Sequence, residues 1–380
     1  MNRIVLAYNT SWYIWNFRMP LIQALRDRGY KVIVLAPRDE YTDRIVASGT
    51  EFRPITLSAK GRNPFQEILT AAAFLRAYRR LRPDVVLHYT IKPNLYGSIA
   101  ARALGIPAID NVTGLGTLFD RKGGLRAAVS LLYKAAFNRV ERVFFQNPDD
   151  LAFFVGSGLV AESRADLLPG SGVDLQQFAP RPRGSGPFTF LFVGRLLKAK
   201  GVDDLIAASR ILAKRLQGFR VVLLGKRDDE DPGAADPHIL ELASTEGVVE
   251  LAGIVDDVRP TIARADCLVL PSYYREGTPR SLLEAAAMGK PLIAADSIGT
   301  REPVRDGVNG YLCRPRDPED LAAKMFGMAT LSEQARSAMG ASSRRIAEER
   351  FDERIVIAKY IEIIDLLVGK AAHEFASRPN

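Results

Sequence analysis

Two carboxylates and several helix-initiating residues stand together in the stretch REGTPRSLLE, residues 275–284. Thr278 is a good N-cap residue and proline is favoured directly after an N-cap, so we predict a helix that begins at Pro279. The amides of Arg280 and Ser281 would have no partner within such a helix, and the positive end of the helix dipole lies at the same place. Phosphate groups bind at helix ends of this kind.

The two carboxylates flank this predicted anion site. Glu276 precedes the helix, and Glu284 lies inside it, roughly 7–8 Å deeper along the axis because each helical residue rises ~1.5 Å. Carboxylates accept hydrogen bonds from hydroxyl groups, so the pair suits a ligand with hydroxyls at both ends and phosphate in the middle. A nucleoside diphosphate sugar has this layout. Either glutamate taken alone is more simply a solvated surface charge.

A second candidate stretch, GRLLKAKG at residues 194–201, follows a predicted strand at Phe188–Val193. Parallel sheets bind ligands at the carboxyl ends of their strands, where this loop lies. Gly194 would let a ligand approach the backbone, while Arg195 and Lys200 offer a planar fork and a point charge to a diphosphate. Basic residues at such junctions are also often merely solvated, and that alternative stays open.

The elements that must position these loops alternate in type along the chain. Short apolar runs alternate with amphipathic stretches, which is the pattern of a parallel, doubly wound sheet. No Gly-x-Gly-x-x-Gly follows the first strand, which argues against a nicotinamide dehydrogenase. In the first half we predict strands at Ile4–Tyr8, Val32–Ala36, Asp84–His88, Pro107–Val112 and Arg142–Gln146. Helices are predicted over Arg18–Arg28, Glu40–Ala47, Pro64–Leu81, Asn94–Leu104 and Gly124–Val140.

The alternation restarts after Pro169–Pro187, a stretch rich in glycine, proline and serine that we interpret as a linker. The chain is long enough for two domains, each with its own core. We therefore predict an α/β protein of two Rossmann-like domains facing a cleft, at residues 1–170 and 187–352.

Composition narrows the class of protein further. Of 380 residues, 47% are hydrophobic and 25% charged, as in ordinary soluble proteins. Cys267 and Cys313 lie in or near buried-strand patterns, so we expect two core cysteines in a protein of the reducing cytoplasm. The chain has no 18-residue apolar run and no signal-peptide pattern, so we expect no membrane-spanning helix.

Basic residues concentrate in the first half: residues 1–150 carry 22 Lys and Arg against 12 Asp and Glu, and the remaining residues carry 30 against 32. This excess suits an anionic substrate or bilayer better than nucleic acid, because no nucleic-acid-binding module is present. Aromatic and basic residues also cluster as they do at lipid interfaces, although core aromatics and solvated arginines are the simpler alternative for any one residue. We hypothesise peripheral membrane docking. The cluster comprises Trp12, Tyr13, Trp15, Phe17, Arg18, Arg76, Arg79, Arg80 and Arg82.

The longer stretch PSYYREGTPRSLLEAAAMGKPLIAAD closely resembles the signature of the retaining family 4 glycosyltransferases, whose two glutamates are separated by seven residues as Glu276 and Glu284 are. In the first half, YIWNFRMPLIQALRDRGYKVIVLAPRDEYTDRI, IKPNLYGSIAARALGIP and NVTGLGTLF resemble the bacterial members that extend undecaprenyl-diphosphate-linked sugars, N-acetylgalactosaminyl transferases among them. The resemblance covers nearly the whole chain. It implies the GT-B fold, with the last helix, about residues 353–380, returning to the first domain.

The resemblance also implies roles for individual residues. Arg195 and Lys200 would contact the donor diphosphate and stabilise charge on the leaving group. Glu276 would hold hydroxyls of the donor sugar, and Glu284 those of the ribose. The remaining donor-binding positions would be Gly194, Ile254, Gly277, Thr278, Ser281 and Leu282. The residues expected to face the cleft on the acceptor side are Lys92, Asn94, Thr113 and Gly114.

Three features complicate the resemblance. Many family members have a Gly-Gly loop after the first strand, where this chain has NTSWY at residues 9–13. Ile91 stands where relatives have a histidine near the donor sugar, and His88, three residues earlier, is more simply a structural histidine. The acidic run DED at residues 229–231 has the form of a metal site in another glycosyltransferase architecture, but we interpret it as a solvated loop. We therefore expect neither a metal nor a cofactor.

The resulting hypothesis is a retaining transferase that moves a hexose or N-acetylhexosamine from a UDP-sugar to a polyprenyl-diphosphate-linked saccharide at the inner face of the plasma membrane. The resemblance implies that retention occurs without a protein nucleophile, the leaving phosphate oxygen accepting the proton of the attacking hydroxyl. Two alternatives stay open: the same fold acting on a soluble sugar acceptor, and a nucleotide-sugar-binding assembly partner without transfer activity.

Overall fold

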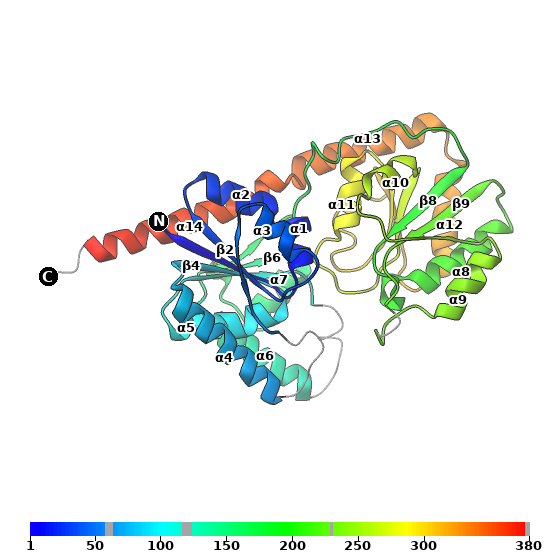
Figure 1. Ribbon diagram of the computed structural model, residues 1–380. Coiled ribbons are helices and arrows are strands. Elements are labelled where there is room, and N and C mark those ends of the chain that lie inside the picture. The colour runs from blue at the N-terminus through cyan, green and yellow to red at the C-terminus, as the bar shows by residue number, and fades with distance from the viewer. Residues whose placement is uncertain (58–63, 116–123, 229–230, 377–380) are drawn as a thin grey trace. The chain divides into compact units, whose positions relative to one another are not determined.

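The computed structural model describes residues 1–57, 64–115, 124–228 and 231–376. The chain forms two compact units, which we call unit 1 (Met1–Leu168 with Arg354–Asn380) and unit 2 (Pro169–Glu353) (Figure 1). No helix in the described ranges is long and apolar enough to span a bilayer.

Unit 1 is built on a seven-stranded sheet whose strands all run parallel, in the order β3-β2-β1-β4-β5-β6-β7. Helices cover both faces of this sheet, which explains why the strands are almost continuously apolar. The strands are β1 (Arg3–Ala7), β2 (Lys31–Ala36), β3 (Glu51–Pro54), β4 (Val85–Tyr89), β5 (Ala108–Val112), β6 (Arg142–Phe145) and β7 (Ala165–Leu167).

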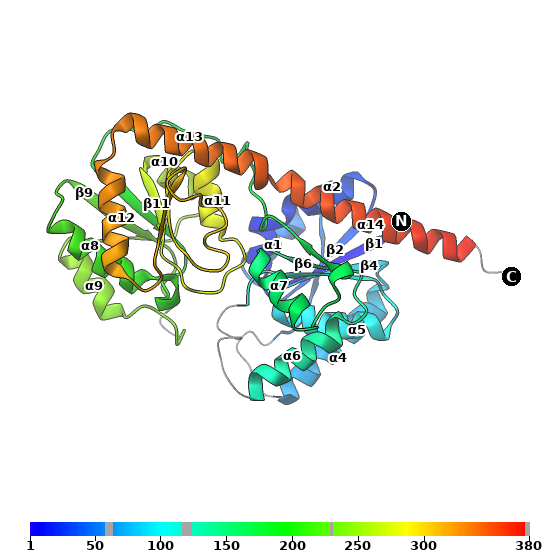
Figure 2. The ribbon, with the colours of Figure 1, turned by 180° about the vertical axis from the view of Figure 1, so that it is seen from behind.

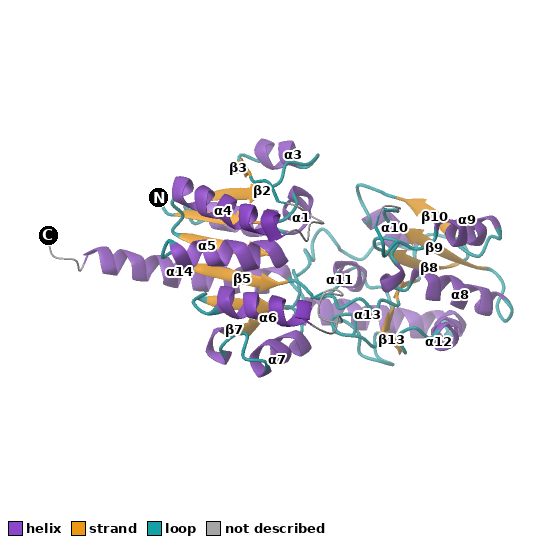
Figure 3. Ribbon diagram, turned by 90° about the horizontal axis from the view of Figure 1, so that it is seen from below, coloured by secondary structure: helices purple, strands orange, loops and turns teal. Residues whose placement is uncertain are grey.

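Two helical layers enclose the sheet of unit 1 (Figure 3). Successive side chains of a strand point to opposite faces. In β1, Val5 and Ala7 pack under α4 to α7, whereas Ile4 and Leu6 pack under α1 to α3 and α14. The helices are α1 (Ser11–Phe17), α2 (Met19–Asp27), α3 (Thr42–Ala47), α4 (Pro64–Leu81), the π-helix η1 (Pro93–Gly97), α5 (Ser98–Ala103), α6 (Gly124–Phe137), α7 (Pro148–Gly156), the 3-10 helix η2 (Glu162–Arg164) and α14 (Glu353–Ala376).

The last helix, α14, packs on unit 1 although the chain reaches it through unit 2 (Figures 1 and 2). Its Tyr360 is fully buried, with its ring centroid 5.0 Å from that of Phe144. The Tyr360 hydroxyl accepts a hydrogen bond of 2.9 Å from the Asn111 amide. The predicted return of the last helix to the first domain is therefore confirmed.

Unit 2 has a six-stranded parallel sheet in the order β10-β9-β8-β11-β12-β13. Its strands are β8 (Phe188–Val193), β9 (Phe219–Leu224), β10 (Glu250–Gly253), β11 (Cys267–Leu270), β12 (Leu292–Ala295) and β13 (Gly310–Cys313). Its helices are the 3-10 helix η3 (Lys198–Lys200), α8 (Val202–Ala213), α9 (Pro237–Thr245), α10 (Arg259–Arg264), α11 (Arg280–Ala287), α12 (Pro318–Thr330) and α13 (Glu333–Arg350). The prediction of two α/β units with parallel sheets is confirmed.

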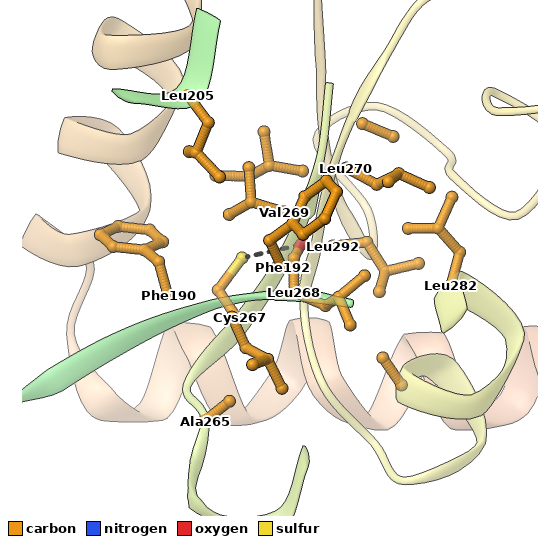
Figure 4. Packing of buried hydrophobic residues seen from close by; sticks show 14 of the residues in the cluster. Phe190, Phe192, Leu205, Ala265, Cys267, Leu268, Val269, Leu270, Leu282 and Leu292 are labelled. Atoms are coloured by element: carbon orange, nitrogen blue, oxygen red, sulfur yellow. Dashed lines mark hydrogen bonds between the residues drawn. The ribbon is translucent and has the colours of Figure 1, made fainter. Parts of the chain in front are cut away.

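Both cysteines lie in the core of unit 2, as expected, and neither forms a disulfide. Figure 4 shows Cys267 of β11 among Phe190, Leu268 and other apolar side chains, with Leu282 of α11 packed nearby. Burial raises the pKa of the Cys267 thiol well above its ordinary value, so this thiol stays protonated at neutral pH.

The stretch Pro169–Pro187, predicted as a linker, belongs instead to unit 2. Val173 is fully buried and pairs with Asp352 in a short parallel bridge, and Phe178 is also buried. A composition rich in Gly, Pro and Ser indicates the absence of regular secondary structure, but it does not exclude packing against a core. Residues 169–180 therefore pack against unit 2 without forming a helix or strand, whereas residues 181–187 are mostly exposed.

Candidate active site

The two predicted donor-binding loops meet at one point of unit 2. Its strand order reverses between β8 and β11, and ligands of such sheets bind at this reversal, beyond the carboxyl ends of the strands. Residues 194–201 follow β8, and Glu276 follows β11. The amides of Tyr273 and Tyr274 both donate to the Ala199 carbonyl, at 3.0 and 2.9 Å, and thereby join the two loops.

Lys200 and Glu276 are in direct contact: the lysine Nζ lies 2.5 Å from the glutamate Oε1, and the two side chains are only 14% and 12% exposed. The Ser272 hydroxyl donates to the same Oε1 at 2.9 Å. Gly201 makes this approach possible, because its φ is +75° and a Cβ there would lie 2.3 Å from the Pro271 carbonyl oxygen. The structure thus brings together the lysine predicted for the diphosphate and the glutamate predicted for the sugar.

Arg195 stands on the same loop but has a looser environment. Its side chain is 46% exposed and lies 3.7 Å from the Asp231 carboxylate, an ion pair too exposed to fix its position. A Cβ on Gly194 would meet only the Phe192 ring at 3.6 Å, so packing alone does not require glycine there. Packing requires glycine at position 225 instead, because a Cβ on Gly225 would lie 1.7 Å from the Gly194 carbonyl oxygen.

The start of α11 differs from its prediction by one position. Pro279 occupies the N-cap and Arg280 is the first helical residue, so Thr278 is not the cap. Thr278 is buried instead against Gly170, where a Cβ would lie 2.8 Å from the threonine Cβ. The physical reason is that packing of the threonine side chain replaces capping. Pro279, at φ −62° and ψ 123°, then provides the extended conformation that precedes the helix.

Of the amides predicted to contact the donor, that of Leu282 is already used. It donates to the Pro279 carbonyl at 3.2 Å, and the Leu282 side chain is fully buried in the core. The assignment of the Leu282 amide to the donor stays a prediction. The Ser281 amide donates to no oxygen in the described part of the chain. The Gly277 carbonyl faces Gly299, where a Cβ would lie only 1.7 Å from it.

Glu284 lies one turn inside α11 and is buried beside Arg280. The arginine Nε is 3.0 Å from the glutamate Oε1, and another guanidinium nitrogen donates to the Gly172 carbonyl at 2.7 Å. Burial raises the pKa of the Glu284 carboxyl, and the Arg280 charge opposes this. Ile254, predicted near the base, follows β10 and is 70% exposed.

The predicted acceptor residues follow the carboxyl ends of two neighbouring strands of unit 1, β4 and β5. Lys92 binds Glu67 of α4 at 2.7 Å. Asn94 is buried and donates to the Asn111 carbonyl at 2.8 Å, whereas its Oδ1 has no partner among the described residues. Thr113 and Gly114 directly follow β5 and are half-buried.

His88 is fully buried in β4 and hydrogen-bonded on both ring nitrogens. Tyr78 lies 2.7 Å from its Nε2, and Asp110 lies 2.6 Å from its Nδ1. Burial raises the pKa of the Asp110 carboxyl, while His88 and the Ser98 hydroxyl oppose the shift. The contacts of His88 with Tyr78 and Asp110 support its interpretation as a structural histidine.

The acidic run at residues 229–231 lies only partly within the described structure, because residues 229 and 230 are outside it. Asp231 is the residue that approaches Arg195. Across the described ranges, no three His, Cys, Asp or Glu side chains are grouped in a way that could hold a metal ion.

The proposed lipid-facing cluster is partly buried. Arg18 was wrongly predicted to be at the surface: it is 2% exposed, with its guanidinium 4.4 Å above the Tyr89 ring, because a cation can be buried against an aromatic face. Of the aromatic residues in the proposed lipid-facing cluster, only Trp12 is exposed. The exposed face of α4 combines three arginines with two aliphatic residues, namely Arg76, Arg79, Arg80, Ile68 and Leu69.

Sequence reasoning did not identify Ser272 or the side chain of Arg280 as parts of the site. Ser272 follows β11 at the strand reversal, and that position was the available signal. Arg280 stands four residues before Glu284, a spacing at which helical side chains meet.

Two family models match this chain: residues 3–147 match Glycosyl transferase 4-like, and residues 187–330 match Glycosyl transferases group 1. With the two parallel-sheet units, these matches define the class of protein. The chain belongs to the family 4 glycosyltransferases, with the GT-B fold.

Among individual relatives, the chain is 28% identical to the N,N'-diacetylbacillosaminyl-diphospho-undecaprenol alpha-1,3-N-acetylgalactosaminyltransferase of Campylobacter jejuni, over 96% of this chain and 99% of that protein. It is 35% identical to the D-inositol 3-phosphate glycosyltransferase of Geodermatophilus obscurus, over 52% of this chain and 46% of that protein.

Solved structures share the fold at low identity. A glycosyltransferase from Rickettsia africae has a TM-score of 0.79 at 15% identity, over 97% of this chain and 98% of that one. The Anabaena protein HepE, solved in complex with UDP, has a TM-score of 0.76 at 19% identity, over 96% and 100%.

Proposed function

We propose that this glycosyltransferase moves a sugar from a UDP-sugar to a polyprenyl-diphosphate-linked saccharide, with retention of configuration. The observation that carries the proposal is the contact of Lys200 with Glu276 at the strand reversal of unit 2. The activity of the Campylobacter jejuni relative, which acts on an undecaprenol-linked sugar, supports the acceptor class. The UDP bound to the Anabaena structure supports the donor class.

In the proposed reaction, the bond between the anomeric carbon and the diphosphate oxygen breaks. A bond from the acceptor hydroxyl oxygen to the same face of that carbon forms. The hydroxyl proton passes to the departing phosphate oxygen. We propose that no protein nucleophile, metal or cofactor takes part. Lys200 and Arg195 stabilise the charge that develops on the leaving diphosphate, while Glu276 holds sugar hydroxyls and Glu284 the ribose.

Lys200→Ala is expected to lower transfer about 100- to 1,000-fold, the usual effect of removing one group that stabilises transition-state charge. The measurement is transfer of radiolabelled sugar from UDP-N-acetylgalactosamine to an extracted polyprenyl-lipid fraction. Lys198→Ala is the matched control, because Lys198 lies on the same loop and is exposed. Near-normal transfer by Lys200→Ala would refute the proposed site.

The same assay separates the alternatives. Label in a water-soluble oligosaccharide would identify a soluble acceptor. Thermal stabilisation by UDP-sugars without transfer to either fraction would identify a nucleotide-sugar-binding assembly partner, because a ligand that binds the folded state raises the melting temperature.

We also propose that the protein works at the cytoplasmic face of the membrane and docks there through the exposed face of α4. Three arginines and two exposed apolar side chains on one helix support contact with an anionic bilayer.

A further inference from the structure

Ser272 occupies a buried position between three loops at the carboxyl edge of the unit 2 sheet. Its side chain is fully buried, and its Oγ lies 2.9 Å from Glu276 Oε1 and 3.4 Å from the Ala199 carbonyl oxygen. The hydroxyl has one proton, and the carboxylate is the nearer and charged acceptor, so the proton points to Glu276. The Tyr274 amide donates to the same Oγ at 3.3 Å.

The backbone of Ser272 is held from the opposite side by the loop that follows β12. The Ser297 hydroxyl donates to the Ser272 carbonyl at 2.5 Å, and the buried Thr300 hydroxyl does so at 3.4 Å. Gly299 of the same loop packs directly against the Gly277 carbonyl. Ser272 therefore cannot move away from Glu276 without breaking contacts to two other loops.

Lys200 donates to the same Glu276 oxygen but is held differently. Its ammonium ends a flexible four-carbon chain and has three donors, so it can turn to another anion with its backbone in place. A diphosphate arriving at this loop offers such an anion. The carboxylate then loses part or all of its lysine contact and keeps the serine contact.

We propose that Ser272 is the positioning residue of Glu276, the fixed donor that holds the carboxylate toward the donor sugar while Lys200 turns to the diphosphate. This inference rests on the proposed function. It predicts that Ser272 matters for the sugar part of the donor and not for the nucleoside diphosphate part.

The test compares the affinities of UDP and UDP-N-acetylgalactosamine for the full-length wild type and for Ser272→Ala by isothermal titration. We expect an unchanged UDP affinity. The loss should be about 10- to 100-fold in sugar-nucleotide affinity, or in kcat in the radiolabel transfer assay, the range for one hydrogen bond to a charged group. In a Glu276→Ala background, Ser272→Ala should have no further effect, because the pair acts as one unit.

Ser209→Ala is the matched control, since it removes a fully buried hydroxyl of the same unit that donates to the Leu205 carbonyl and not to the carboxylate. Equal losses of UDP and sugar-nucleotide affinity in Ser272→Ala, or the same pattern in Ser209→Ala, would indicate a merely structural serine and overturn the inference. If the wild type bound neither ligand, the proposed function itself would fail, and the inference with it.

Discussion

The carboxyl of Glu284 is buried beside Arg280, and burial raises its pKa above the ordinary value of 4.5. The unfolded chain therefore ionises more readily than the folded protein. The contribution of this group to stability is fully present below pH 4.5 and is lost as the pH rises through the folded-state pKa. At neutral pH the ionised Glu284 carboxylate, which we propose binds the ribose hydroxyls, therefore lowers the stability of the folded protein somewhat, as ligand-binding groups often do.

Glu284→Gln is accordingly expected to melt no lower than the wild type at pH 8, with any gain disappearing below pH 4.5. Glutamine keeps an oxygen for Arg280 but gives the ribose a neutral acceptor, so UDP affinity should fall about 10- to 100-fold. Thermal melts from pH 4 to pH 8 and titration with UDP measure the two effects, and the exposed Glu349→Gln is the control. A lower melting temperature at pH 8 would contradict the first expectation.

The short helix η3 can lie against the end of β11 only because glycine follows it. Gly201 has φ +75° and would place a Cβ 2.3 Å from the Pro271 carbonyl oxygen. Gly218 has the same φ and no atom within 4 Å of its Cβ position. Alanine at Gly218 should cost about 1–2 kcal/mol from the left-handed backbone alone. Gly201→Ala should lower the melting temperature more than Gly218→Ala does, and it should also reduce transfer because Lys200 must shift. Equal melting temperatures of the two variants would mean that the loop around Gly201 adjusts freely.

The charge of the whole molecule is uneven, and the structure puts part of the basic excess on one exposed helix. On the scale of ~1 kcal/mol per basic residue near an anionic surface, reversing Arg76, Arg79 and Arg80 to Glu should weaken vesicle binding at least about 100-fold. Sedimentation with phosphatidylglycerol vesicles measures this effect. The control reverses three exposed basic residues of unit 2, Lys214, Arg264 and Arg345. Equal binding of both variants would reject α4 as the docking surface.

The sequence by itself determined the architecture, because alternation of apolar and amphipathic runs is a local property that burial in a parallel sheet imposes. The pattern located β1 and β8 to within one residue. The loop at residues 194–201 was indicated by its position after β8, and the family signature covers the loop that holds Glu276. Local patterns failed where tertiary packing overrode propensity. The aromatic segment Ser11–Phe17 forms a helix that was not predicted, and Tyr13 stacks on Tyr8 there.

Only the tertiary structure decided which charged groups meet. Lys200 and Glu276 are 76 positions apart in the chain and touch because β8 pairs with β11, while β9 and β10 extend the sheet on the other side of β8. Nothing in the local composition of either loop specifies that order of strands. Tertiary arrangement also decided the burial of Arg18, the position of Ser272 beside Glu276 and the packing of Thr278. Desolvation and hydrogen bonding depend on neighbours in space, which local sequence does not specify.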